Sequence, residues 1–141
     1  MNDRLKTIVD LEKYPIYDLN SPIIKNLIKK CKKELDQFSC STIPNFILPK
    51  SLEIMNLELK KQLDEVYMSK ESVNAYLYAK DDPTLAKDHP KRIFMSRYNG
   101  YLNSDCFKED SEMKYLYETD ELLKFISACL GVSPIFRWAD P

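Results

Sequence analysis

The feature that most constrains the fold of this chain is a long alternating segment between Arg92 and Leu102. Because successive side chains of a β-strand point to opposite faces, a period of two is typical of an extended strand. Gly100 interrupts the alternation and indicates a bulge or a close approach of another backbone. One face of the predicted strand would carry Ile93, Met95, Arg97, Asn99 and Tyr101, and the other Phe94, Ser96, Tyr98 and Leu102.

Amphipathic helices are predicted on both sides of this strand. Ser21 and Pro22 suit the cap and the first position of a helix, and apolar residues follow them at helical spacing. A second helix is expected from about Ser51, and two helical pieces follow Asp105, the later one ending at Gly131. Further short strands are expected at residues 40–43, 73–78 and 135–138, with a short strand or turn at 14–17. The mixture predicts an α+β fold, with N-terminal helices packed on a mostly antiparallel sheet.

Length and charge place limits on the class of protein. The 141 residues suit a single domain over 1–141, with residues 1–13 expected as a loosely ordered tail. A net charge of −1 gives no global field that would attract nucleic acid or an anionic membrane surface, so neither is an expected partner. No run approaches the roughly 18–20 apolar residues of a membrane span, and no secretory signal is visible, so a cytoplasmic location is expected. The four cysteines form no Cys-x-x-Cys pair and are expected to be reduced.

The residue types that carry most enzymatic chemistry are sparse. A non-haem iron site of the two-histidine, one-carboxylate type cannot form within this chain, because His89 is its only histidine. No Gly-x-Ser-x-Gly elbow and no glycine-rich phosphate loop is present. Neither a catalytic residue nor a metal ligand is therefore predicted for this chain, which should be inactive alone.

The order of several short motifs nevertheless resembles one family. A Tyr-Pro-x-x-Asp-x-x-Ser-Pro motif at residues 14–22 leads into a helix with a central cysteine, and further motifs follow along the chain to residue 141. The later motifs are Cys40, Ile43-Pro44-x-Phe46, Asp88-His-Pro-Lys-Arg92, Tyr98-Asn-Gly100, Leu116-Tyr117, Leu130-Gly131 and Trp-Ala-Asp-Pro141. Together the motifs resemble the N-terminal half of iron(II)/2-oxoglutarate-dependent oxygenases, in the group that contains hydroxylases and halogenases of free amino acids and other small molecules.

The resemblance implies a fold and a cofactor pair. The chain would be the incomplete front part of a double-stranded β-helix (cupin-like) oxygenase, the N-terminal portion of a larger domain. Fe(II) and 2-oxoglutarate would serve the complete enzyme, and this chain alone would bind neither. The iron ligands and the arginine that binds 2-oxoglutarate would lie beyond Pro141, so no iron ligand is transferred onto any position here.

The resemblance also suggests residues that would wall the pocket of a small-molecule substrate. Arg92 or Arg97 could pair with a substrate carboxylate, because a guanidinium fork matches that geometry. Asn99 and Tyr98 could line the cavity, and Asp140 could hold a substrate amine. For Arg92 a surface or strand-pairing role is the favoured interpretation, and for Arg97 and Asp140 the two roles are balanced.

Two alternatives remain open at this point. The chain could be a non-catalytic interaction module that pairs with a C-terminal half or another protein through an open sheet edge, since exposed edges recruit strands. It could also be a degenerate remnant without activity. The substrate, and the choice between hydroxylation and halogenation, are not determined by the sequence.

Overall fold

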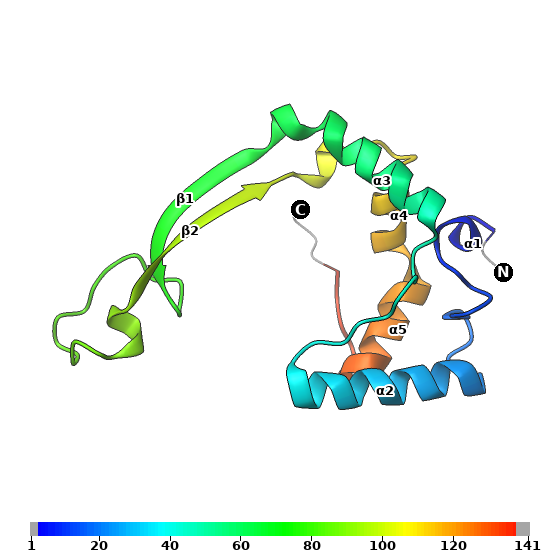
Figure 1. Cartoon of the computed structure of the whole chain (residues 1–141), viewed down its shortest axis with the longest axis horizontal. Helices are drawn as coiled ribbons and strands as arrows, with labels where there is room; N and C mark the ends of the chain where they lie inside the picture. Colours follow the sequence, from blue (N-terminus) through cyan, green and yellow to red (C-terminus); the bar gives the residue numbers. More distant parts are fainter. Residues whose placement is uncertain (1–2, 138–141) are drawn as a thin grey trace. The chain divides into compact units, whose positions relative to one another are not determined.

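The computed structural model describes residues 3–137, which belong to two compact units (Figure 1). The helical unit comprises residues up to Lys61 together with those from Phe107 onward, and the ribbon unit comprises Gln62–Cys106. Across the described residues there are five α-helices and one two-stranded antiparallel sheet, which confirms the α+β class. Single-domain organisation and a double-stranded β-helix stay predictions.

The helical unit is built from helices that pack on one another. Helix α2 packs against α5, and α1, α3 and α4 contact one another (Figure 1). Two hydrogen bonds join α3 to the start of α4: Ser51 donates to Glu112, and the Ser111 hydroxyl donates to Glu58 at 2.8 Å. The helices are α1 (Leu5–Ile8), α2 (Pro22–Phe38), α3 (Pro49–Lys61), α4 (Glu112–Glu118) and α5 (Asp120–Leu130).

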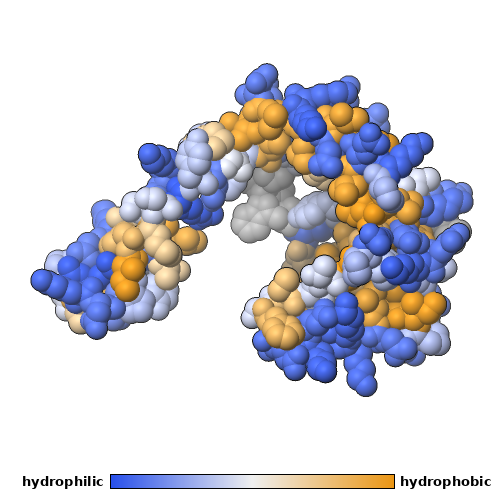
Figure 2. Space-filling model, viewed as in Figure 1, coloured by the Kyte–Doolittle hydropathy of each residue, from blue (hydrophilic) through white to orange (hydrophobic). Residues whose placement is uncertain are grey.

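The ends of α2 and α5 confirm the local predictions. The Ser21 hydroxyl accepts a hydrogen bond from the backbone N–H of Ile24 at 3.3 Å, and Pro22 occupies the first turn, where its missing N–H costs nothing. Gly131 ends α5 with a φ of +70°, a left-handed conformation that glycine adopts without a steric penalty. Lysines cover the outer side of α2, which Figure 2 shows as hydrophilic.

The N-terminal segment is part of the core. Where the sequence predicts a loosely ordered tail over residues 1–13, Leu5, Ile8 and Val9 are completely buried. Backbone hydrogen bonds hold the segment against a later one, from Asp10 N–H to the carbonyl of Phe46 (3.0 Å) and from Leu48 N–H to that of Ile8 (2.8 Å). These tertiary contacts order the N-terminal segment, although its own sequence shows no clear helical or strand periodicity. The core cluster also contains Leu11, Tyr14, Ile16, Ile24, Cys31, Met55, Leu116, Phe125 and Cys129.

Two short strands expected in this unit do not form within the described residues: residues 40–43 are irregular, and residues 135–137 belong to no strand. Of residues 14–17, expected as a short strand or a turn, residues 16 and 17 lie in a turn. Pro44 lacks an N–H, and Asn45 has a φ of +58°, so the chain near residue 43 cannot continue as an extended strand. The core cluster contains no residue of the sheet, so it is formed by helices and the N-terminal segment and not by helices packed on strands.

The ribbon unit consists of β1 (Tyr67–Asn74) and β2 (Phe94–Tyr101), joined by a long loop and paired from Tyr67↔Tyr101 to Asn74↔Phe94. Strand β2 confirms the alternating segment. Strand β1 was expected at residues 73–78 and lies earlier, because the chain turns after Asn74. The Asn74 side-chain oxygen accepts hydrogen bonds from the backbone N–H groups of Tyr76 (2.9 Å) and Tyr78 (3.1 Å). Among residues 3–137 no helix has the length and apolar character needed to cross a membrane.

Candidate functional site

The register of the ribbon decides which predicted site residues share a face. Arg97 and Asn99 pair with Glu71 and Ser69, and alternation places all four side chains on one face. Tyr98 pairs with Lys70 on the opposite face. Arg97 and Asn99 therefore share one face of the ribbon, whereas Tyr98 lies on the opposite face.

Arg97, Asn99 and Tyr101 form a hydrogen-bonded triad on that face. The Arg97 Nη2 donates to the Tyr101 hydroxyl at 3.1 Å. With its oxygen turned toward Arg97, the Asn99 carboxamide accepts from Arg97 Nη2 and from the Tyr101 hydroxyl, each at 3.0 Å, and its nitrogen donates to the Tyr98 carbonyl at 3.1 Å. In the opposite orientation the carboxamide nitrogen, which is a donor, would face the N–H donors of Arg97. We therefore assign to Asn99 the orientation in which its oxygen faces Arg97. The triad holds the guanidinium in place on the strand.

Tyr101 is the functional candidate that the sequence analysis did not select. Its position two residues after Asn99 and four after Arg97 puts it on the same face of a strand. The spacing was therefore visible in the sequence, but the hydroxyl contact to both partners is a property of the folded ribbon. Tyr101 orients Arg97 and offers a hydroxyl beside it.

Arg97 has unused capacity for an anion. Glu71 lies directly across the ribbon, yet within residues 3–137 no ion pair joins these two side chains. The partners that Arg97 does have are the neutral oxygens of Asn99 and Tyr101. A guanidinium carries five N–H donors in a planar fork, so donors remain for a carboxylate.

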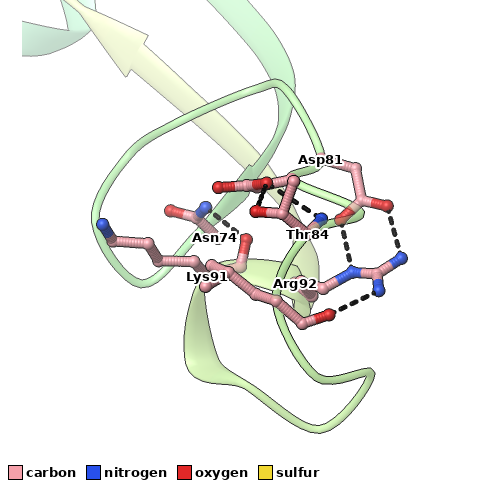
Figure 3. A network of polar contacts seen from close by, with 7 residues as sticks. Asn74, Asp81, Thr84, Lys91 and Arg92 are labelled. Atoms are coloured by element: carbon pink, nitrogen blue, oxygen red, sulfur yellow. Dashed lines mark hydrogen bonds and ion pairs between the residues drawn. The ribbon is translucent and has the colours of Figure 1, made fainter.

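Arg92 is engaged within the loop between the strands (Figure 3). Its Nε and Nη2 donate to the two oxygens of Asp81, each at 2.8 Å, and its Nη1 donates to the carbonyl of Leu85 at 3.0 Å. Asn74 donates to the carbonyl of Lys91 at 2.7 Å, which ties the end of β1 to the same loop. These contacts engage Arg92 within the loop, and its suggested role in binding a substrate carboxylate stays a prediction.

The bidentate pair of Arg92 and Asp81 predicts an acid-sensitive loop. Hydrogen bonds from Arg92 lower the pKa of the Asp81 carboxyl below its ordinary value of 3.8. The pKa of Asp81 is lower in the folded protein than in the unfolded chain. The ion pair therefore stabilises the loop fully at pH values above 3.8, and this stabilisation is lost as the pH falls through the lowered pKa. We expect the NMR resonance of the Arg92 Nε–H to stay protected from exchange at pH 5 and to lose protection only below pH 3.8.

The replacement Asp81→Asn provides the control for this titration, because it removes the charge and keeps the size. A carboxamide does not titrate in this range, so the variant should lose the change in Arg92 Nε–H protection near pH 3.8, and Asp110→Asn, an exposed aspartate in the other unit, should behave as the wild type does. An Arg92 signal that still loses protection below pH 3.8 in Asp81→Asn would contradict the assignment.

The described residues do not fit an iron site. In the part of the chain that the structure describes, no group of three or more His, Cys, Asp or Glu side chains comes together. A facial iron site needs three protein ligands, so no step of an iron-dependent reaction is assigned to these residues. Asp140, the remaining predicted site residue, lies outside the described residues.

No family model matches the chain, and neither does any curated protein or solved structure. Roles for the ribbon residues therefore rest on their own geometry and on the order of motifs in the sequence. The geometry provides an anchored arginine with free donors, on a face shared with a carboxamide and a phenol. Such a set can bind a small molecule through a carboxylate.

Proposed function

We propose that this chain is the N-terminal part of an Fe(II)/2-oxoglutarate-dependent oxygenase that hydroxylates or halogenates a small molecule such as a free amino acid. The observation that carries the proposal is the triad of Arg97, Asn99 and Tyr101 on one face of the ribbon. The order of the short motifs along the chain supports the same family. In this proposal the triad walls the substrate pocket, and Arg97 binds the substrate carboxylate.

The open edges and exposed apolar side chains of the ribbon support the proposal that it belongs to a larger sheet. A two-stranded ribbon alone is marginally stable in water, and stable sheets have three or more strands or pack on a helix. Within the described residues each strand pairs only with the other, so each has one open edge. Large apolar side chains are exposed on both faces, among them Tyr67, Met68, Met95 and Tyr98. Further strands at these edges would exclude water from the triad and strengthen a guanidinium–carboxylate pair.

The chemistry of the reaction belongs to the cofactors, which when bound would activate dioxygen for attack on a substrate C–H bond. Residues of this chain would bind and orient the substrate. Arg97 would take the carboxylate, and Asn99 and Tyr101 would keep the guanidinium aligned. The ligands of Fe(II) and 2-oxoglutarate would come from residues outside these 141.

The test is to express the chain together with whatever its reading frame encodes after Pro141. We expect that segment to contain His-x-Asp or His-x-Gly and a distal histidine. Supplied with Fe(II), 2-oxoglutarate and dioxygen, the extended protein should form succinate when the correct free amino acid is added, and the 141-residue chain should not. A reading frame without the histidine segment, or an extended protein that forms no succinate with any amino acid, would refute the proposal.

A second candidate is a non-catalytic interaction module, favoured by the exposed apolar residues and open edges of the ribbon. It would recruit a strand of a partner protein through backbone hydrogen bonds. Light scattering coupled to size exclusion separates the two functions. A stable complex of the 141-residue chain with a co-expressed protein that lacks iron ligands would favour the interaction module. A stable complex with a protein that supplies the iron ligands would favour the oxygenase.

A further inference from the structure

A cavity lies between α2, α5 and the segment that follows α5. Its volume of about 560 Å³ is within the range of roughly 300–1,000 Å³ that is typical of ligand pockets. The apolar part of its wall includes Ile28 of α2, Leu123 and Ala128 of α5, and Ile135. All the described residues that line it belong to the helical unit, so the cavity does not depend on the ribbon.

The segment after α5 is held along that helix at two points. Close to the end of the helix, the Ser127 hydroxyl donates a hydrogen bond to the carbonyl of Val132. Further along, the Arg137 Nη2 donates to Asp120 at 2.7 Å and its Nε to the carbonyl of Tyr117 at 3.2 Å. The segment therefore runs back toward the start of α5 and forms a fixed third wall of the cavity (Figure 1).

The charged groups at this cavity are positive. Lys32 of α2 and Lys124 of α5 line it, and no Asp or Glu does among the described residues. The Lys32 ammonium lies at the end of α5, 3.6 Å from the point that a Cβ of Gly131 would occupy. Among residues 3–137 no carboxylate forms an ion pair with either lysine, and Asp120, one turn before Lys124, is bound by Arg137. The cavity therefore presents two cations beside an apolar wall.

This combination restricts the chemistry of a ligand. Exposed ammonium groups contribute little affinity by themselves, so a small hydrophilic anion such as phosphate would gain little here and would leave the apolar wall in water. A cationic amphiphile would bring like charges together. An anion with an apolar body satisfies both parts of the cavity, since its body removes the wall from water and its charge meets the lysines.

We propose that the cavity between α2 and α5 binds a monomeric amphiphilic carboxylate, of the class of medium-chain fatty acids. The alkyl chain packs against the apolar wall that includes Ile28 and Leu123. Lys32 and Lys124 attract the carboxylate and donate charge-assisted hydrogen bonds to it. Binding is non-covalent, and it is independent of the proposed oxygenase function.

The test is isothermal titration calorimetry of the 141-residue protein with decanoate, at concentrations below those at which decanoate forms micelles. We expect one equivalent to bind. Octanoate should bind about tenfold more weakly, because two fewer methylene groups are buried. Decyltrimethylammonium has an alkyl chain of the same length and the opposite charge, so its affinity should be lower than that of decanoate by about tenfold or more.

Variants locate the bound ligand. Ala128→Trp places a large side chain in the cavity and should abolish binding. Lys32→Gln and Lys124→Gln should each weaken the binding of decanoate about threefold, an effect typical of an exposed charge. Lys33→Gln is the matched control, because Lys33 is an exposed lysine of α2 that does not line the cavity, and it should leave the affinity unchanged.

A measurement on the wild type needs no variant to fold. Decanoate should shift the NMR methyl resonances of Leu123 and Ile135, which line the cavity, and should leave that of Met95, an exposed apolar residue of the ribbon, in place. Shifts centred on Met95, or undiminished binding by an Ala128→Trp variant that circular dichroism shows to be folded, would put the ligand elsewhere and overturn the proposal. Absence of binding by the wild type, equal affinities for decanoate and decyltrimethylammonium, or equal effects of Lys32→Gln and Lys33→Gln would also overturn it.

Discussion

Replacing Ile24 by alanine is expected to lower the free energy of unfolding of the helical unit by about 2–5 kcal/mol. The Ile24 side chain is fully buried on α2 and belongs to the core cluster. Its removal loses the transfer free energy of three carbon atoms and leaves a cavity that rigid neighbours fill only in part. Since small domains have a total stability of roughly 5–15 kcal/mol, the loss is a large fraction of it. Urea unfolding followed by circular dichroism measures the change.

Ile23→Ala is the matched control, because it makes the same chemical change one residue earlier. The Ile23 side chain is 54% exposed, so its loss should cost less than about 1 kcal/mol. Alanine also has the higher helix propensity, which offsets part of that cost. Equal shifts of the urea midpoint in the two variants would contradict the assignment of Ile24 to the core.

Under the proposed function, replacing Arg97 by alanine in the extended protein is expected to lower kcat/KM for the proposed amino-acid substrate by about 10²-fold or more. Truncating one partner of a hydrogen-bonded charge pair costs roughly 2–5 kcal/mol, in part because the other charge is left unpaired, and each 1.4 kcal/mol is a factor of ten. The carboxamide of the same amino acid lacks the negative charge. It should be a poor substrate of the wild type and should lose much less activity than the acid on Arg97→Ala.

Lys70→Ala is the matched control for Arg97. Both residues are cationic and lie on paired strands, but Lys70 shares its face with Tyr98 and so points away from the triad. Its replacement should change kcat/KM less than about threefold, an effect typical of an exposed charge. A Lys70→Ala effect as large as that of Arg97→Ala would show that the substrate lies elsewhere, as would equal losses for the acid and its amide.

Local sequence signals were sufficient wherever the structure depends on local interactions. The cap of α2 at Ser21, the left-handed end of α5 at Gly131 and the alternation along β2 were all predicted and are present. Each depends on atoms within a few residues along the chain, through a backbone hydrogen bond, a steric preference or the pleat of a strand. The shared face of Arg97 and Asn99 follows from the same pleat.

The sequence-based predictions were wrong where the structure depends on contacts between distant parts of the chain. Strand β1 was placed too late, because the pairing with β2 outweighs the weak alternation after Val73 and the Asn74 side chain ends the strand. The first residues were expected to be loose, because nothing in their sequence shows the backbone contacts that they make near Phe46. The pairing of Arg92 with Asp81 likewise depends on how a long loop folds back.

The sequence by itself determined the α+β class, the helices α2 and α5 and the polar face of β2, because periodicity and end signals are local. Only the tertiary structure decided which residues meet: Leu5 with the core, Tyr101 with Arg97 and Asn99, and helix α2 with α5. Cys31 on α2 and Cys129 on α5 are far apart in the sequence, and they belong to one core cluster because the apolar faces of these helices are buried. Hydrophobic burial is non-directional, so composition and pattern predict that such faces are buried but not against which partner.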